Sequence, residues 1–112
     1  MIDFKKLSKE HESLFPKADL QSQVIKLEEE LGEVSEAKSE EQVIKELADC
    51  IICCIGMYRF APKTAELLES VIGQAVKPAV DEAVERKWKI NLGRTWQWNG
   101  KTYKHVGKDG NE

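Results

Sequence analysis

The sequence has little of what marks secreted, membrane-spanning or nucleic-acid-binding proteins. Its three cysteines are odd in number and crowd into one segment, so they cannot form a disulfide framework. The longest apolar run, 50–58, is too short to cross a bilayer, and the polar N-terminus has no signal-peptide core. The net charge of −3 gives no support for binding nucleic acid through bulk positive charge. We therefore expect a cytoplasmic protein that binds neither membrane nor nucleic acid.

The familiar motifs of phosphate chemistry are also missing. The sequence contains no P-loop, no Gly-x-Gly-x-x-Gly and no Gly-x-Ser-x-Gly. Phosphate chemistry would therefore have to rest on a metal ion and basic side chains. With 112 residues, the chain is expected to form a single domain, residues 1–112, with a modest apolar core.

Apolar residues recur at helical spacing through most of the chain. A first helix is predicted from a cap at Asp3 to about residue 14, and Pro16 ends it. We assign His11 on this helix no role, since such a histidine is as often a packing or surface residue as a ligand. A second helix runs from about residue 19 to about residue 38. One stripe of it is expected to pack against the core, and this stripe consists of Leu20, Val24, Leu27, Leu31 and Val34.

A third helix is predicted just after Ser39, because Ser39 and Gln42 have the spacing of a capping box, and Pro62 ends it. So short a connection makes an antiparallel pair of the second and third helices. Between Cys50 and Met57 the third helix is apolar on all sides, so we expect it to pack against a second subunit. The alternative is that helices of the same chain enclose it. The three cysteines are expected to be core thiols, with a redox or zinc site as the alternative.

Helical periodicity continues beyond Pro62 and changes to strand periodicity only after Gly93. We predict a fourth helix over about 64–76, a break at Pro78 and a last helix over about 79–91. Alternating residues joined by an Asn-Gly turn then predict a β-hairpin at about 95–106, before a tail at 107–112. The predicted fold is an all-α bundle of four to five helices with a short C-terminal β-hairpin.

Two pairs of acidic residues, each one turn apart, stand on the second and third helices. Glu30 and Glu33 precede Ser39 by nine and six residues, and Glu46 and Asp49 follow it by seven and ten. At about 1.5 Å per residue, the two pairs lie at matching levels, roughly 10 Å and roughly 14 Å from the turn. Converging carboxylates repel one another unless a cation joins them, and all-oxygen ligands suit Mg²⁺ or Mn²⁺. One such pair alone is usually a solvated helix face, so the prediction depends on the match between the two.

The pattern Glu29-Glu30-x-x-Glu33, followed after twelve residues by Glu46-x-x-Asp49, resembles the signature of the MazG-like all-α nucleoside triphosphate pyrophosphohydrolases. The likeness covers about residues 18–96. It implies a Mg²⁺-dependent enzyme that hydrolyses a ribo- or deoxynucleoside triphosphate to the monophosphate and pyrophosphate, and that works as a homodimer or homotetramer. It also implies that the two acidic pairs bind the metal ion and that Glu29 is the base for the attacking water.

A basic segment at the end of the last helix supplies the charge that the acidic pairs lack. Lys87, Asn91 and Arg94 share one face if the helix extends that far, and this stretch resembles the family's phosphate-binding segment. The alternative is that these cations stabilise the helix dipole. Trp96 and Trp98 share one face of the predicted strand, where they could stack on a nucleobase or cover the core.

Two other functions stay open. A narrower dUTP or dCTP pyrophosphatase would use the same metal chemistry and differ only in its base pocket. A non-enzymatic helical oligomerisation module would carry the acidic residues as a solvated surface. Release of pyrophosphate from mixed nucleotides in the presence of Mg²⁺ separates the enzymes from the module.

Overall fold

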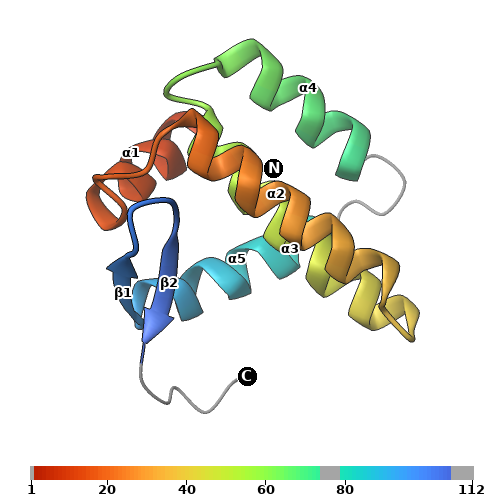
Figure 1. Ribbon diagram of the computed structural model, residues 1–112. Helices are drawn as coiled ribbons and strands as arrows, with labels where there is room; N and C mark the ends of the chain where they lie inside the picture. Colours follow the sequence, from red (N-terminus) through yellow and green to blue (C-terminus); the bar gives the residue numbers. More distant parts are fainter. Residues whose placement is uncertain (1, 74–78, 107–112) are drawn as a thin grey trace.

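The computed structural model describes residues 2–73 and 79–106, which form five helices and a β-hairpin (Figure 1). The elements are α1 (Phe4–Leu14), α2 (Leu20–Ser35), α3 (Glu40–Met57), α4 (Pro62–Gly73), α5 (Ala79–Leu92), β1 (Thr95–Trp98) and β2 (Tyr103–Val106). This confirms the predicted helical fold with a C-terminal hairpin. Three predictions fall on residues outside the described ranges: the break at Pro78, the end of the fourth helix at about residue 76, and the tail at 107–112. No helix in the described ranges is long and apolar enough to span a membrane.

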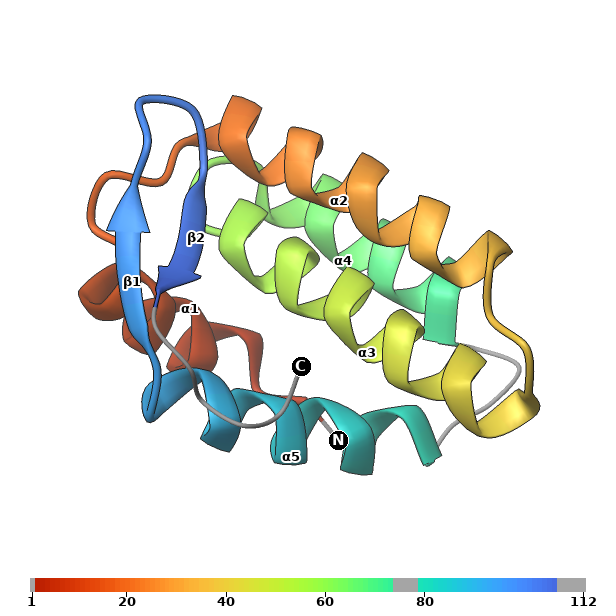
Figure 2. The same ribbon diagram turned by 60° about the horizontal axis from the view of Figure 1, so that its bottom comes forward.

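Helix α3 lies at the centre, and the other four helices pack around it (Figure 2). Helix α2 runs antiparallel beside it, as predicted, while α1, α4 and α5 cover its other sides. Every residue from Cys50 to Met57 is buried within this one chain. The expectation that a second subunit covers this segment is therefore corrected. An apolar helix can be enclosed in so short a chain because four amphipathic neighbours each contribute one face.

Side-chain caps set where the helices begin. Asp3 and Ser39 each accept a hydrogen bond from a backbone N–H three residues later, at 3.1 Å, which confirms the predicted starts of α1 and α3. Asp19 begins α2 through a reciprocal capping box with its third helical residue. Helix α2 ends at Ser35, earlier than predicted. Pro62, predicted to end α3, is instead the first residue of α4, where a missing N–H costs no hydrogen bond.

Helix α2 turns a different stripe toward α3 from the one predicted. Leu20, Val24 and Leu31 are 41%, 42% and 45% exposed, so the expectation that they pack against the core is wrong. The stripe that is buried or half-buried follows the same spacing from another start, and it consists of Gln23, Leu27, Glu30 and Val34. The helix is thus rotated so that polar side chains, and not only apolar ones, face the centre of the molecule.

The hairpin is antiparallel, and its register pairs Trp98 with Tyr103. The connecting loop therefore holds residues 99–102, longer than the two-residue Asn-Gly turn that the sequence predicts. The side-chain oxygen of Asn99 accepts hydrogen bonds from two backbone N–H groups of this loop, both at 2.9 Å, which favours the wider turn. Gly100 has a φ of +93°, a conformation that favours glycine.

Candidate functional site

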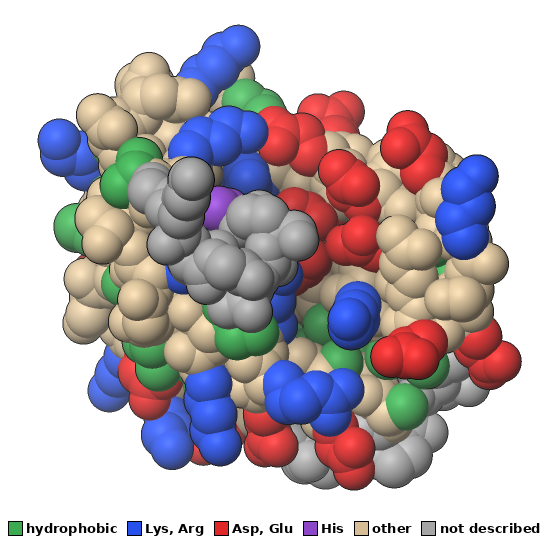
Figure 3. Space-filling view, turned by 90° about the horizontal axis from the view of Figure 1, so that it is seen from below, with side chains coloured by type: hydrophobic (Ala, Val, Ile, Leu, Met, Phe, Trp, Pro, Cys, Tyr) green, Lys and Arg blue, Asp and Glu red, His purple; other side chains and the backbone are tan. Residues whose placement is uncertain are grey.

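A cavity of about 620 Å³ opens between the helices and the hairpin. Side chains from α1, α2, α3, α5 and both strands line it. Nine of the ten residues that the sequence singles out are among them, namely Glu29, Glu30, Glu33, Glu46, Asp49, Lys87, Asn91, Arg94 and Trp96. The tenth, Trp98, does not line the cavity and instead packs on Tyr103, with ring centroids 5.1 Å apart. Figure 3 shows a face of the molecule on which acidic side chains gather beside Lys and Arg.

Three carboxylates meet at the acidic end of this cavity. Glu30 on α2 and both Glu46 and Asp49 on α3 each place one oxygen within 4.8 Å of the others. Oxygen donors at this spacing could hold a hard divalent ion. Glu33, predicted as a fourth ligand, lines the cavity one turn farther along α2 but lies outside this group. We refer to Glu30, Glu46 and Asp49 as the carboxylate group.

Burial raises the pKa of each member of the carboxylate group. It is the main cause that lifts the pKa of Glu30 to about 7, and the charges of Asp49, Glu46 and Glu33 add to it. Burial and then the Asp49 charge raise the pKa of Glu46. Burial also raises the pKa of Asp49, although the neighbouring Lys87 charge opposes this. Each shift favours the uncharged acid, and a cation bound between the three would favour the carboxylates instead.

The basic residues reach the cavity in a different way from the one predicted. Lys87 on α5 lies beside the carboxylate group, with its Nζ 3.6 Å from Oδ1 of Asp49. The buried Asn91 follows one turn later. Helix α5 ends at Leu92, so Arg94 does not share a helical face with these residues. The turn after the helix, in which the N–H of Arg94 donates to the Asn91 carbonyl at 3.2 Å, nevertheless brings Arg94 to the cavity wall.

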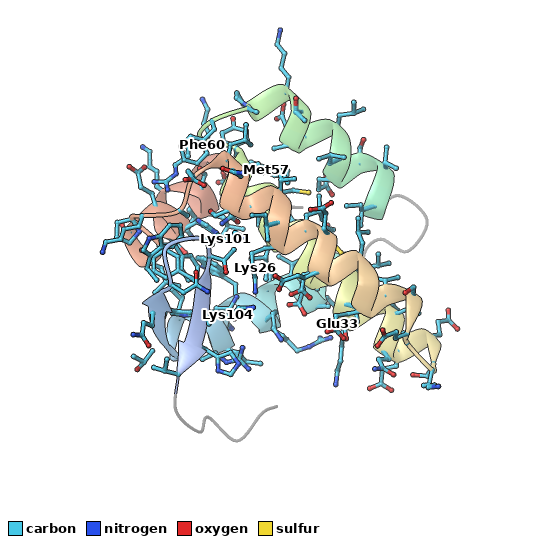
Figure 4. All side chains as sticks on the ribbon, viewed as in Figure 1. Lys26, Glu33, Met57, Phe60, Lys101 and Lys104 are labelled. Carbon is cyan, nitrogen blue, oxygen red and sulfur yellow. The ribbon has the colours of Figure 1, made fainter. Side chains whose placement is uncertain are left out.

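Glu29 lies at the edge of the cavity between two lysines. Its Oε1 is 3.3 Å from Nζ of Lys104 on β2 and 3.7 Å from Nζ of Lys26 on its own helix. Figure 4 shows these two lysines close together, with Glu33 farther along α2. Neither lysine belongs to the site residues that the sequence predicts. Nothing in the sequence signals Lys104, because its place depends on how the hairpin folds back over α2.

The remaining part of the cavity is aromatic, and the sequence analysis missed most of it. The ring of Phe15 packs against Trp96 and Tyr103, with centroids 4.9 Å and 5.0 Å apart. His11, to which the sequence assigns no role, is only 3% exposed and lines the same region with Gln23. These residues come from four separate segments and follow no motif. We refer to this region as the aromatic end.

The three cysteines are free and buried, which confirms the expectation of core thiols. Burial is the main cause that raises the pKa values of Cys50 and Cys54 to about 12, so neither thiol ionises at neutral pH. Among the described residues, no cysteine belongs to a group that could hold a metal ion. The redox and zinc alternatives therefore gain no support.

No family model matches this chain, and no curated protein or solved structure matches it either. The residues and the geometry of the cavity are therefore the basis on which a function can be assigned.

Proposed function

We propose that the chain is a Mg²⁺-dependent nucleoside triphosphate pyrophosphohydrolase of the MazG-like superfamily. It would convert a ribo- or deoxynucleoside triphosphate and water into the monophosphate and pyrophosphate. The observation that carries this proposal is that one cavity combines three features: the carboxylate group, the cations Lys87 and Arg94, and an aromatic end. A metal-bound polyphosphate needs the first two features, and a nucleobase suits the third.

The carboxylate group fits Mg²⁺, because its donors are all oxygens and a divalent ion would stabilise the charged carboxylates that burial disfavours. Glu30, Glu46 and Asp49 would hold the ion, with Glu33 as a further oxygen donor one turn away. Bound Mg²⁺ supplies polarisation of the phosphoryl oxygens and lowers the pKa of a coordinated water. Mn²⁺ satisfies the same donors.

The other residues of the cavity would contact the phosphates and the attacking water. Lys87 and Arg94 would form charge-assisted hydrogen bonds to the phosphates, and the Asn91 amide would add a neutral one. Glu29 would orient the attacking water or accept its proton, an assignment that rests on the family resemblance. Because Lys87 also approaches Asp49 at 3.6 Å, it links the phosphate contacts to the carboxylate group.

We also propose that the protein works as a homodimer or homotetramer. Support comes from apolar side chains that one chain leaves in solvent on α2 and α4. Leu67 and Val71, one turn apart on α4, are 64% and 68% exposed. Covering them in an interface would be favourable, at about 25 cal/mol per Å² of apolar surface. A stable, fully active monomer at micromolar concentration, seen by light scattering, would contradict this.

The test is hydrolysis of a panel of ribo- and deoxynucleoside triphosphates with Mg²⁺, in which pyrophosphate and orthophosphate are detected separately. We expect pyrophosphate and the monophosphate as products, and no product after chelation of the metal. Asp49→Asn should slow this release by about a thousandfold. The matched control is Glu28→Gln, because Glu28 is exposed on α2 and does not line the cavity. A lack of product from every triphosphate, or release of orthophosphate alone, would refute the proposal.

A further inference from the structure

The aromatic end contains two buried polar side chains for which the proposed chemistry has no use. His11 on α1 is 3% exposed and Gln23 on α2 is 7% exposed, and both line the cavity. Buried polar groups are costly unless they form hydrogen bonds. Nδ1 of His11 has no hydrogen-bond partner among the described residues, and the amide of Gln23 makes a long contact of 3.4 Å with Oγ of Ser22. We refer to His11 and Gln23 as the polar pair.

The polar pair is uncharged. Burial, with a smaller contribution from the Arg59 charge, lowers the pKa of His11 to about 4. At neutral pH the imidazole therefore offers one N–H donor and one acceptor nitrogen, and the Gln23 amide offers both kinds of group as well. Neutral donors and acceptors of this kind suit the edge of a planar heterocycle better than a phosphate.

The polar pair owes its position to a glycine on α3. A Cβ atom on Gly56 would collide with the side-chain oxygen of Gln23 and would lie 2.7 Å from Cε1 of His11. Only glycine therefore lets both side chains approach the α3 backbone this closely. The need for glycine is steric, since Gly56 lies within a regular helix.

The aromatic end also holds its rings in fixed positions. Trp96 Nε1 donates a hydrogen bond to the Asn91 carbonyl at 2.9 Å, and the Tyr103 hydroxyl accepts one from the Lys17 N–H at 2.9 Å. Phe15 packs against both of these rings. Preorganised aromatic rings favour stacking of a base.

The distance between the two ends matches a nucleotide. Gln23 precedes Glu30 by seven residues on α2, and Gly56 follows Asp49 by seven residues on the antiparallel α3. Both helices therefore separate the polar pair from the carboxylate group by about 10 Å along their axes. This is comparable with the span of a nucleoside from the far edge of its base to its 5′ phosphate.

We propose that the polar pair reads the hydrogen-bonding edge of a nucleobase, and so determines which nucleotide the protein binds. The inference rests on the proposed function, because it assumes that the acidic end holds the phosphates of the same ligand. It adds two specificity-determining residues, His11 and Gln23, and a positioning residue, Gly56.

The experiment is calorimetric titration of the five common nucleoside 5′-monophosphates into the protein with Mg²⁺, before and after Gln23→Leu. We expect the wild-type dissociation constants to differ by about tenfold or more between bases, since a site that hydrogen-bonds one base edge leaves polar groups unpaired with another. Gln23→Leu keeps much of the side-chain volume and should compress this range to within about twofold.

A pair of alanine substitutions tests the role of Gly56. Gly56→Ala should displace the polar pair and compress the same range of dissociation constants. Gly32→Ala is the matched control, because a Cβ at Gly32 on α2 meets no atom within 4 Å. Should Gly56→Ala fail to fold, as circular dichroism would reveal, His11→Phe keeps the aromatic packing and removes the polar edge.

The outcomes separate this inference from the proposed function. Equal binding of all bases by the wild type, or an unchanged preference in Gln23→Leu, would overturn the inference even if triphosphates are hydrolysed. A preference that disappears in Gln23→Leu supports it, even if no triphosphate releases pyrophosphate. In that case the proposed function alone would fail.

Discussion

At the acidic end of the cavity the pKa of Glu30 is raised to about 7, whereas at the aromatic end the pKa of His11 is lowered to about 4. Burial is the main cause of both shifts, and in both cases it favours the uncharged form. The carboxylates are close enough to share a cation that would restore their charge. The imidazole has the Arg59 guanidinium nearby, which opposes protonation. The same physical effect thus prepares one end for a metal ion and keeps the other neutral.

Loss of a carboxylate oxygen from the carboxylate group should lower kcat/KM more than any other change proposed here. Asp49→Asn is expected to lower kcat/KM by about a thousandfold, roughly 4 kcal/mol, because a neutral amide is a poor partner for a divalent ion. Glu33→Gln should cost less, about tenfold, since Glu33 lies outside the carboxylate group. Steady-state pyrophosphate release measures both. If Asp49→Asn kept more than about a tenth of wild-type kcat/KM, direct ligation by Asp49 would be excluded.

Acid should destabilise the aromatic end. Because the pKa of His11 is about 4 in the folded state and 6.5 for an ordinary histidine, the unfolded chain binds more protons between these pH values. The contribution of neutral His11 to the free energy of unfolding is therefore complete above pH 6.5. About 3 kcal/mol of this stability is lost as the pH falls to 4. Denaturant unfolding of wild type and His11→Phe at several pH values isolates this effect. Parallel pH curves for the two proteins would contradict it.

In metal-free protein, the acidic end should contribute a pH dependence of stability opposite to that of His11: its contribution falls as the pH rises. The raised pKa of Glu30 means that the folded state binds more protons between pH 4.5 and about 7, so this contribution to stability falls as the pH rises through that range. Saturating Mg²⁺ should reverse the trend by favouring the carboxylates. Thermal melts with Mg²⁺ and with chelator, in wild type and Glu30→Gln, test this. Equal pH dependence in wild type and variant would argue against it.

The basic residues should affect ligand binding more than stability. If Lys87 and Arg94 contact the phosphates, replacing either with alanine should weaken binding of a non-hydrolysable triphosphate by about 1.5–3 kcal/mol. If they only stabilise the helix dipole, the change should be about 0.3–1 kcal/mol of stability with unaltered affinity. Calorimetry beside thermal melts distinguishes the two. Lys89→Ala is the control, because Lys89 is exposed on α5 and does not line the cavity.

The smallest expected effect is at the edge of the cavity. Lys104 and Glu29 form an ion pair whose side chains are 52% and 43% exposed. Such pairs contribute about 0–1 kcal/mol and weaken with salt. Lys104→Ala should therefore lower the free energy of unfolding by less than about 1 kcal/mol. A larger loss, or one that is insensitive to salt in denaturant titrations, would mean that Lys104 has another structural role.

Local signals in the sequence were enough to bring together three of the four predicted metal ligands, whereas Glu33 lies outside the carboxylate group. The cap at Ser39 sets the turn between α2 and α3, and counting residues from it brings Glu30 level with Asp49. Periodicity could not give the rotation of α2, because the two possible stripes share Leu27 and Val34, and packing chooses between them. The choice favours the stripe that contains Gln23 and Glu30, which leaves Leu20 and Val24 in solvent.

The aromatic end could not be predicted, since it depends on contacts between segments that are distant in sequence. Phe15 contacts Trp96 and Tyr103 only because the hairpin folds back against the residue that follows α1, and His11 contacts Phe15 in turn. The enclosure of α3 was missed for the same reason. An all-round apolar helix needs cover, but its sequence does not say which elements provide it.

The buried cysteines of α3 allow the opening of the helical core to be measured by their rate of alkylation. Cys50 and Cys54 are 0% exposed and free, so a thiol-specific reagent reaches them only when the central helix separates from its neighbours. The rate of alkylation in native buffer therefore follows the frequency of that opening, with no label or substitution required. A molecule that binds in the cavity only when the helices are packed should slow alkylation of Cys50 and Cys54 as its concentration rises above its Kd. Mass spectrometry separates these two sites from Cys53, which lines the cavity itself.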